Sequence, residues 1–389
     1  MNIFLIGLPG CGKTTVGRKL AEVMKLPFID IDECIETDSH MTISEIFSSF
    51  GESGFRERER KILHKYSKDS KAIISTGGGI VKTSGNIELM RERGTVVFLD
   101  RVPNEQNVDW TNRPARAPMD ELVRERRPLY LASADLVFPL RCDFCVIGDP
   151  IGHTLSPVLH SAIFKSLGIS ATYGLSNVSR ETLFIFTQLA KISDMRGFNV
   201  TIPHKASIIP LLDSISSDAQ TCRAVNTVSV INGKLYGYNT DMDGLKMALM
   251  ARREGVGYRG QRVLILGDGG AASGILYKAR QDSAEITIAS RKNGGIVDER
   301  VVIEVSNFDI IINATPLGML GNNKNFADFE FLNHLPRHAL VCDLIYNPLE
   351  TALLIEAKKR NLAILNGLTM LISQAILADA IFFEGIEKA

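Results

Sequence analysis

A glycine-rich turn near the start of the sequence has the spacing of a phosphate-binding loop. Gly7, Gly12, Lys13 and Thr14 follow the pattern G-x-x-x-x-G-K-[ST] within "FLIGLPGCGKTTVGRKL", between an apolar run and an amphipathic stretch. In such a loop, backbone N–H groups point at an anion, and the following helix contributes its positive end. We expect Lys13 to reach the terminal phosphates and the Thr14 hydroxyl to hold Mg²⁺. The motif predicts a nucleoside triphosphate site but does not identify the acceptor of the phosphate.

A second glycine-rich turn, "LILGDGGAASG", has the spacing of a dinucleotide fingerprint. Gly267, Gly269 and Ala272 follow a G-x-G-x-x-A pattern directly after an apolar run. The first glycine allows a tight turn, and the second allows pyrophosphate to approach the backbone. The small third residue lets the following helix pack closely, so the stretch predicts a nicotinamide dinucleotide site.

The residues that follow the next apolar run, "EITIA", bear on which dinucleotide binds. At this place the fold normally presents an acid to the ribose hydroxyls of NAD, whereas this sequence has Ser290, Arg291 and Lys292. A carboxylate would repel a 2′-phosphate, and a guanidinium can bind one through paired charge-assisted hydrogen bonds. The sequence therefore favours NADP over NAD, with solvated charges after a strand as the alternative.

Polar clusters upstream of the second loop contain residues suited to carbonyl reduction. Lys205 lies in "GFNVTIPHK", Asn226 in "CRAVNTV" and Asp241 in "GYNTDMDGL". An ammonium group can stabilise and protonate the carbonyl oxygen on which negative charge grows during hydride transfer. A carboxylate can hold that lysine and a substrate hydroxyl in line. Spacing alone leaves a structural ion pair or two surface charges equally open.

The elements that must position these residues alternate between short β-rich runs and helical stretches. The runs "NIFLI", "AIIS", "TVVFLD" and "ADLVF" are separated by segments such as "TISEIF" and "ELVRERR". This alternation predicts parallel strands with crossover helices. The pattern restarts near residue 141 and again after "ARREGVGYRG", which indicates three α/β lobes in series.

The composition is that of a soluble globular protein. The 389 residues are 45% hydrophobic and 23% charged, and 44 basic side chains balance 44 acidic ones. We therefore expect no nucleic-acid or membrane partner, and we expect no apolar run long enough to span a bilayer. Six cysteines are too few for a disulfide scaffold, which favours the cytoplasm. For the lone C-x-x-C of Cys142 and Cys145, two half-buried strand cysteines are favoured over a zinc or redox site.

The sequence from about Cys145 to the C-terminus resembles the shikimate dehydrogenases. The shared motifs include "IGDPIGHTLSPVLH", "GFNVTIPHK", "AVNT", "GYNTD", "INATPLGM", "DLIYNPLETALL" and "NGLTMLISQA". The resemblance implies reduction of 3-dehydroshikimate with NADPH, with Lys205 and Asp241 as the catalytic pair. It implies that the substrate is bound by Thr154, Ser156, Thr201, Asn226, Tyr346 and Gln374. It implies that NADP is bound by Gly267, Asp268, Gly269, Gly270, Ala271, Ser290, Arg291, Lys292, Thr315, Leu344 and Gly367.

Three departures from the dehydrogenase pattern concern residues of these sets. Ser290, Arg291 and Lys292 replace the family's usual Asn-Arg-Thr but keep the arginine. Thr154 stands where the family often has serine, and it keeps the hydroxyl group. Asp268 stands where alanine is usual, so we expect an anion close to the pyrophosphate.

The first 140 residues or so resemble shikimate kinase. Asp30 and Asp32 stand two residues apart in "PFIDIDECIE", and we expect a strand end there to point both side chains into one site. The resemblance implies that Asp30 acts with Thr14 on Mg²⁺ and that Asp32 holds the attacking hydroxyl. It places Arg113 in the lid, where the guanidinium stabilises the transferred phosphoryl group together with Lys13. It implies nucleotide binding by Gly7, Gly10, Gly12, Thr14 and Thr15, and substrate binding by Arg56, Gly77, Gly78, Gly79 and Arg126.

The kinase-like part also departs from its family. The lid segment is shorter than usual, and after "ADLVFP" the sequence lacks the family's closing helix, which would cover one face of the sheet. Two alternatives follow: either the second domain covers that face, or the kinase lobe is weakened.

Together these features predict an α/β chain with a P-loop, nucleoside-monophosphate-kinase-like parallel sheet followed by a two-lobed dehydrogenase. We expect a kinase domain at 1–140 and a dehydrogenase domain at 141–389. Its substrate lobe would comprise 141–242 and 366–389, and its Rossmann NADP lobe 243–365. The expected function is a bifunctional enzyme that uses NADP(H), ATP and Mg²⁺ for reduction of 3-dehydroshikimate and phosphorylation of shikimate. The alternatives are a dehydrogenase with a degenerate kinase-derived module, and a kinase for another hydroxylated metabolite.

Overall fold

The computed structural model describes residues 1–68, 71–103, 118–152, 154–322 and 324–387. The chain divides into two compact units. The first unit comprises Met1–Pro157, Ser170–Leu211 and Val230–Leu235, and the second comprises Val158–Ile169, Leu212–Ser229 and Tyr236–Ala389. The domain boundaries expected from the sequence stay a prediction.

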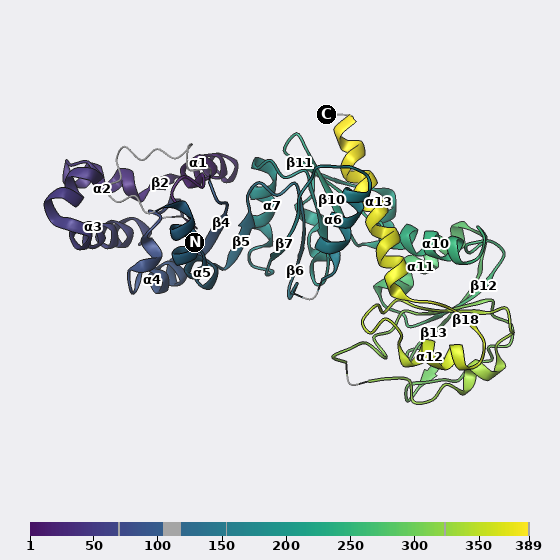
Figure 1. The fold of residues 1–389 in the computed structure, drawn as a ribbon. Coiled ribbons are helices and arrows are strands. Elements are labelled where there is room, and N and C mark those ends of the chain that lie inside the picture. The colour runs from purple at the N-terminus through teal and green to yellow at the C-terminus, as the bar shows by residue number, and fades with distance from the viewer. Residues whose placement is uncertain (69–70, 104–117, 153, 323, 388–389) are drawn as a thin grey trace. The chain divides into compact units, whose positions relative to one another are not determined.

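The first sheet has five parallel strands in the order β2-β3-β1-β4-β5 (Figure 1). Its central strands are buried along their length, as in a parallel sheet with both faces covered. The strands are β1 (Asn2–Ile6), β2 (Phe28–Asp30), β3 (Ile73–Ser75), β4 (Gly94–Asp100) and β5 (Leu136–Pro139). The helices are α1 (Lys13–Met24), α2 (Ile31–Ser39), α3 (Ile43–Ser67), α4 (Asn86–Arg93), α5 (Met119–Ser133) and the 3-10 turn η1 (Ile80–Lys82). The strands predicted from the four β-rich runs are confirmed.

The second sheet has six strands in the order β7-β6-β8-β10-β11-β9. These strands are β6 (Phe144–Gly148), β7 (Tyr173–Asn177), β8 (Gly197–Val200), β9 (Ser214–Ile215), β10 (Thr227–Ile231) and β11 (Lys234–Tyr238). The helices in this part of the chain are α6 (Ser156–Ser166), α7 (Leu183–Ile192), α8 (His204–Ser207), α9 (Ser217–Cys222) and α10 (Asp241–Arg252), with the 3-10 turn η3 (Ile209–Leu211). Cys145 lies buried in β6 as predicted, whereas Cys142 lies in the turn before that strand.

The third sheet has five parallel strands in the order β13-β12-β16-β17-β18. These strands are β12 (Arg262–Leu266), β13 (Glu285–Ala289), β16 (Ile310–Asn313), β17 (Leu340–Asp343) and β18 (Ala363–Leu365). Other elements here are the hairpin β14 (Ile296–Val297) and β15 (Arg300–Val301), the helices α11 (Gly270–Gln281) and α12 (Ala352–Lys359), and the 3-10 turn η4 (Glu330–His334). Alternate residues of β12 enter two cores: Val263 packs with residues of α10 and α11, and Leu264 with residues of α12. The alternating βα pattern therefore predicted this lobe correctly.

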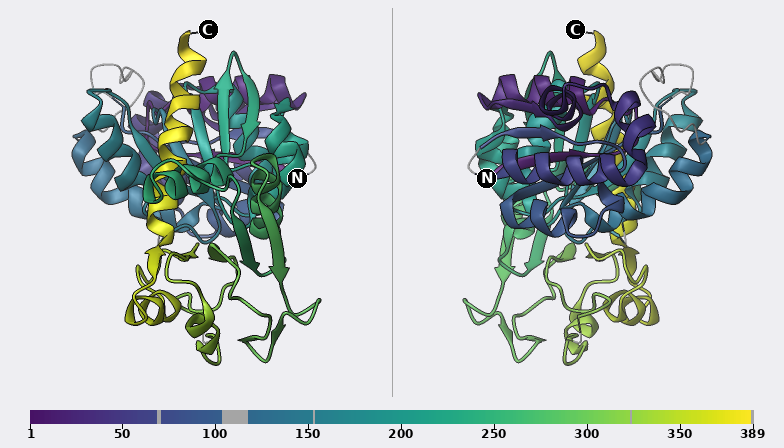
Figure 2. Two further views of the ribbon diagram at one scale, coloured as in Figure 1. Left: turned by 90° about the vertical axis from the view of Figure 1, so that its right-hand side faces the viewer. Right: turned by 90° about the vertical axis from the view of Figure 1, so that its left-hand side faces the viewer.

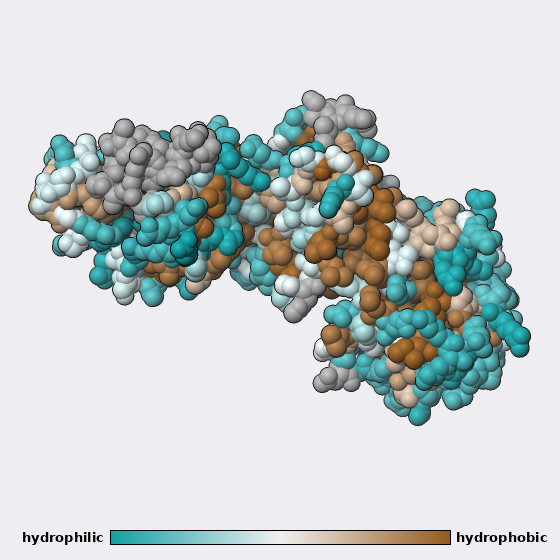
Figure 3. Space-filling model, in the orientation of Figure 1, coloured by the Kyte–Doolittle hydropathy of each residue, from teal (hydrophilic) through white to brown (hydrophobic). Residues whose placement is uncertain are grey.

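The C-terminal helix α13 (Gly367–Glu387), yellow in Figures 1 and 2, is long and apolar. Its window Gly367–Glu384 has a mean hydropathy of 1.4 and is long enough to cross a membrane, so the expectation that no run reaches this length was wrong. The helix packs along α10, and its Asp379 is buried against His160 of α6. Apolar side chains gather on the surface over α6 and α13 (Figure 3), among them the exposed Val158 and Ile376.

Candidate functional sites

The phosphate loop joins β1 to α1, and its lysine is held across the loop. Gly7 has φ 149°, and a side chain there would come within 3.0 Å of the Leu99 carbonyl oxygen, which explains the need for glycine. Lys13 is buried, and its Nζ donates hydrogen bonds of 2.9 Å to the carbonyl oxygens of Gly7 and Leu8. The ammonium group is therefore fixed beside the backbone that would cradle an anion. Gly10 and Gly12 lie in the same turn, and Thr15 lies in the first turn of α1.

Thr14 and Asp30 lie side by side, which fits a shared magnesium site. The Thr14 hydroxyl donates a 2.8 Å hydrogen bond to Asp30 Oδ2, and Asp30 is buried at the end of β2. Mg²⁺ in phosphoryl-transfer sites typically takes one or two protein ligands and completes its shell with water and phosphate oxygens. The donor set of one hydroxyl and one carboxylate matches this requirement.

Asp32 lies in a different secondary-structure element from the one expected. The prediction of two side chains alternating along a strand was wrong, because β2 ends at Asp30 and α2 begins at the next residue. Asp30 caps this helix by accepting a 3.1 Å hydrogen bond from the backbone N–H of Asp32. Asp32 therefore lies in the first helical turn, with its Oδ1 3.0 Å from where a Cβ on Gly77 would stand.

The turn Gly77–Gly79 is enclosed by charged side chains from α2 and α3. A Cβ on Gly77 would lie 2.6 Å from Glu59 Oε1, and one on Gly79 would collide with the guanidinium of Arg56. Arg56 in turn binds Glu59 at 2.7 Å and Glu52 at 3.2 Å. A side chain at Gly77 or Gly79 would force these charged groups to move, because they approach the backbone closely.

Arg126 and Tyr130 of α5 also contact this turn. Both donate hydrogen bonds to the Gly78 carbonyl oxygen, Arg126 at 3.3 Å. Arg126 Nε is buried without a hydrogen-bond partner among the described residues and lies 3.6 Å from a Glu125 carboxylate oxygen. The structure thus brings Asp32, Arg56 and Arg126 to one glycine turn, and an arginine with a spare buried donor suits a planar carboxylate.

Glu59 belongs to this cluster and was missed by the sequence reasoning. Its side chain is completely buried, and burial raises the pKa of Glu59 to about 7, although Arg56 acts to lower it. Oε1 has no hydrogen-bond partner among the described residues. The spacing of Glu59 three residues after Arg56 on one helix could have revealed it.

Arg101 is a second residue that the sequence reasoning missed. It follows β4, and its Nη1 lies 3.6 Å from where a Cβ on Gly12 would stand, beside the phosphate loop. Its Nε is buried without a hydrogen-bond partner in the described part of the chain. Because β4 neighbours β1 in the sheet, their carboxyl ends share one edge, and this rule could have indicated Arg101. Arg113 lies outside the described residues.

In the first unit, four of the expected dehydrogenase residues follow β6 and β8, which are neighbours in the second sheet. The Thr154 hydroxyl donates a 3.1 Å hydrogen bond to Ser156 Oγ at the start of α6. Thr201 follows β8, where it packs against Gly148 at the end of β6. Lys205 lies in α8, which is anchored by a hydrogen bond between the buried His204 ring and the Val178 carbonyl oxygen.

In the second unit, three further expected residues form one hydrogen-bonded cluster. Asn226 Nδ2 donates to Asp241 Oδ1 at 2.8 Å and lies 3.4 Å from Gln374 Oε1. The backbone N–H of Thr240 donates a 2.8 Å bond to Asn226 Oδ1, which fixes the orientation of the amide. Gly244 allows α10 to approach α13 at Gln374, because a Cβ there would lie 2.7 Å from the Gln374 backbone nitrogen. The arrangement places the Asp241 carboxylate and the side-chain amides of Asn226 and Gln374 next to one another.

The dinucleotide loop opens onto a cavity of about 340 Å³ at the carboxyl edge of the third sheet. Gly267 has φ 108° and packs against Thr315, whereas Gly269 and Gly270 have open space where side chains would be. Open backbone N–H groups at the start of α11 fit a pyrophosphate. The expected NADP residues that line the cavity are Gly267, Asp268, Gly269, Ser290, Arg291 and Thr315.

The unusual Asp268 is paired with Lys292, one of the expected residues that lie outside this lining. The two side chains are 3.3 Å apart, and both are exposed, Lys292 at 85% and Asp268 at 39%. The lysine thus offsets the acid beside the loop. Glu299 is a second acid in the lining, 3.9 Å from Lys324. Arg291 and the backbone therefore remain the groups best suited to an anion here.

Of the remaining expected residues, Leu344 and Tyr346 lie after β17, and Gly367 lies at the start of α13. Gly367 packs against the Leu344 carbonyl oxygen so closely that a Cβ would collide with it. Burial raises the pKa of Asp343, the residue before Leu344, although Thr351 donates a 2.7 Å hydrogen bond to it. This network holds the loop that carries Leu344 and Tyr346. Ala271 lies in the first turn of α11.

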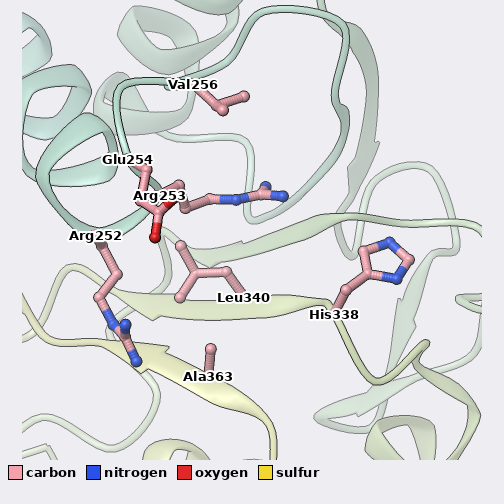
Figure 4. A pocket seen from close by; sticks show the side chains of 7 residues that line it. All are labelled: Arg252, Arg253, Glu254, Val256, His338, Leu340 and Ala363. Atoms are coloured by element: carbon pink, nitrogen blue, oxygen red, sulfur yellow. The ribbon is translucent and has the colours of Figure 1, made fainter.

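A further cavity of about 390 Å³ lies at the opposite edge of the third sheet (Figure 4). Its lining includes Leu340 and Ala363, which begin β17 and β18, and the side chains of Arg252, Arg253 and His338. In open α/β sheets, ligands bind beyond the carboxyl ends of the strands. None of the predicted site residues lines this cavity.

The fold and the sites define a chain that joins a phosphate-loop lobe to a dinucleotide-binding enzyme. Residues 9–140 match the family model for shikimate kinase, and residues 146–228 match the model for the shikimate dehydrogenase substrate binding domain. The shikimate dehydrogenase (NADP(+)) of Methanococcus maripaludis is 40% identical over 253 residues, covering 61% of this chain and 90% of the relative. The chain belongs to the shikimate dehydrogenase family, and its N-terminal part is a shikimate kinase family domain.

Other relatives agree with this assignment. The shikimate dehydrogenase (NADP(+)) of Staphylococcus epidermidis is 41% identical over 248 residues, covering 60% of this chain and 89% of the relative. A crystal structure of shikimate 5-dehydrogenase from Thermus thermophilus, in complex with NADP(H) and shikimate, is 30% identical with a TM-score of 0.54. That match covers 62% of this chain and 93% of the solved one.

Proposed function

We propose that the chain is a bifunctional enzyme that reduces 3-dehydroshikimate to shikimate and then phosphorylates shikimate on the 3-hydroxyl group. The dehydrogenase part rests on the family membership and on the cavity at the dinucleotide loop. The kinase part rests on one observation above all. Lys13, Thr14 and Asp30 lie together at the phosphate loop, and Asp32, Arg56 and Arg126 surround the glycine turn Gly77–Gly79 in the same lobe.

For the reduction, we assign NADP(H) to the cavity beside Gly267. NADPH supplies the hydride when bound, and the protein must bind the substrate and deliver a proton. We assign Lys205 to protonation of the carbonyl oxygen, where an ammonium stabilises the growing charge. Asp241 is assigned to a substrate hydroxyl, and its hydrogen bond with Asn226 fixes the carboxylate. Thr154, Ser156, Thr201, Tyr346 and Gln374 are the proposed remaining contacts to substrate hydroxyls and carboxylate.

For the phosphorylation, ATP is the proposed phosphate donor and Mg²⁺ the proposed metal. Phosphoryl transfer depends mainly on positioning and on charge stabilisation. Lys13 is assigned to the transferred phosphate, Thr14 and Asp30 to the metal, and Asp32 to the attacking hydroxyl. Arg56 and Arg126 are assigned to the substrate carboxylate, for which the guanidinium geometry is suited.

A second candidate is a dehydrogenase whose kinase-derived domain binds nucleotide without transferring phosphate. The absence of a helix between β5 and β6, which are separated by 140–143, favours this alternative. A coupled assay separates the two candidates. The full chain is supplied with 3-dehydroshikimate, NADPH, ATP and Mg²⁺, and NADPH consumption and shikimate 3-phosphate are followed together. NADPH loss with accumulation of unphosphorylated shikimate would reject the bifunctional proposal and support the second candidate.

A further inference from the structure

Helix α7, which follows β7 of the second sheet, is buried on more than one side. Seven of its ten residues are buried: Leu183, Ile185, Phe186, Thr187, Gln188, Leu189 and Ala190. A helix on the surface of a lobe buries only one stripe, and a helix that is apolar all round is covered on several sides. Contacts of α7 with its own sheet therefore account for only part of its burial.

The second partner of α7 is the first sheet, within the same compact unit. The ring of Phe186 lies 5.2 Å from that of Phe198 in β8 and 5.4 Å from that of Phe138 in β5. All three rings are fully buried. The helix also packs against α1, the helix that begins at the phosphate loop (Figure 1). One side chain thus joins two cores.

Strand register shows which face of the first sheet α7 covers. Phe98 of β4 stacks on Tyr130 of α5, so the neighbouring Leu99 points to the opposite face. Leu99 pairs with Phe138, whose side chain therefore lies on the face opposite α5. On this face α1 covers the region of β1 and β3. In the described part of the chain, the region of β5 would lack a helix covering this face without α7, because the chain passes from β5 to β6 without a helix.

The edges of the two sheets also meet. β5 is the last strand of the first sheet and β7 the first strand of the second. The buried Ser176 of β7 donates a 2.6 Å hydrogen bond to the carbonyl oxygen of Val137 in β5. An open strand edge exposes unpaired backbone groups, and here a partner from the next sheet takes up one of them.

We propose that α7 is a shared covering helix, so that the kinase-like sheet and the strands β6, β7 and β8 form one cooperative folding body. The apolar face of β5 is then an interaction surface whose partner is a helix of the dehydrogenase half. The kinase-like domain depends on this helix for its own stability. Of the two alternatives left open by the sequence, the packing favours coverage of the bare face by the downstream domain.

Hydrogen exchange of the full chain, followed peptide by peptide, tests this dependence. Phe186→Leu removes both ring contacts but keeps an apolar side chain, and it should speed exchange in β5 and α1 by at least about tenfold. Phe164→Leu is the matched control, because Phe164 is equally buried in α6 and its ring packs on Phe383 of α13. The control should leave exchange in β5 and α1 within about twofold of the unaltered protein.

A substitution on the other side of the same contact tests the dependence in the opposite direction. Phe138→Leu, on the kinase side, should speed exchange in α7 and β8 as well as in β5. If Phe186→Leu loosens only α7 and β8, or Phe138→Leu only β5, the two halves fold independently and the proposal is rejected. None of these measurements requires either catalytic activity, so the outcome is separate from that of the proposed kinase function.

Discussion

At the scale of single residues, the phosphate loop determines where the ammonium group of Lys13 lies. Lys13 is held by two backbone carbonyl oxygens of its own loop, so its ammonium group is fixed beside the loop backbone. The spacing of glycine, lysine and threonine was sufficient to predict a glycine-rich loop between a strand and a helix, but not these two hydrogen bonds. The neighbouring Arg101 was not predictable in this way, because it comes from a distant part of the sequence.

Arg101 is expected to contribute to nucleotide binding. Its guanidinium lies beside Gly12, and hydrogen bonds from charged donors are worth about 1.5–3 kcal/mol, which corresponds to a roughly 10- to 100-fold loss of affinity. Arg101→Ala should weaken binding of a non-hydrolysable ATP analogue by this amount in titration calorimetry. Arg91→Ala, an exposed arginine of α4, is the control. Equal affinities in both variants would remove Arg101 from the site.

Glu59 is expected to make stability depend on pH. Its pKa rises from 4.5 to about 7 on folding, so the folded chain retains a proton that the unfolded chain has released. The free energy of unfolding should therefore fall as the pH rises from about 4.5 to about 7. Glu59→Gln should reduce this decline, measured by pulse proteolysis in urea at both ends of the range.

The control for this experiment is Glu52→Gln. Glu52 binds the same Arg56, but its side chain is 57% exposed. Its removal should leave the pH dependence unchanged. A decline of the same size in Glu59→Gln and in the unaltered protein would show that another group titrates.

At the scale of elements, sequence patterns predicted which helices and strands exist better than they predicted the residues at which these elements begin and end. The parallel strands of the first and third sheets follow from apolar runs alternating with helical stretches. Asp32 was assigned to a strand end because its spacing from Asp30 suits one, but Asp30 caps a helix and the strand stops. A cap and a strand end look alike in a short stretch such as "FIDID". The hydrogen-bond partner decides between them, and only the structure supplies it.

The buried pair of His160 in α6 and Asp379 in α13 is expected to contribute to stability. His160 Nδ1 and Asp379 Oδ1 are 2.6 Å apart, and both side chains are buried. Asp379→Ala would leave the imidazole without this partner, and an unsatisfied buried polar group costs about 1–3 kcal/mol. Urea denaturation should show this loss, whereas Glu350→Ala, which breaks an exposed pair with Lys358, should cost less than about 1 kcal/mol. Equal effects of the two substitutions would contradict a structural role for the buried pair.

At the scale of the whole molecule, the sequence predicted the order of the parts but not how they support one another. The family resemblance located both nucleotide loops, because the residues of each lie close together in the sequence. The role of α7 depends on Phe138 of β5 and Phe186 of α7, which lie far apart in the sequence. The segment "LFIFTQLAKI" is apolar at nearly every position, and this was the only local indication that two surfaces cover it.

The two proposed activities are expected to respond separately to substitutions at their own proposed sites. Lys13→Ala should abolish phosphoryl transfer and leave NADPH oxidation almost unchanged. Lys205→Ala should lower NADPH oxidation by about 10²–10⁴-fold, which is typical of general acid–base residues, and leave phosphoryl transfer from ATP to supplied shikimate intact. Both rates are measured on the full chain. Loss of both activities from either substitution would contradict this division, and a fall of less than about tenfold for Lys205→Ala would reject its assignment.

The direct passage from Pro139 to Phe144 has a consequence for how such a chain can evolve. A gene cut at this point would release a first product with Phe138 of β5 exposed to water, and a second product with Phe186 of α7 uncovered where it packs against β5. Separation would therefore lower the stability of both products at once, so a fusion of this kind is difficult to reverse.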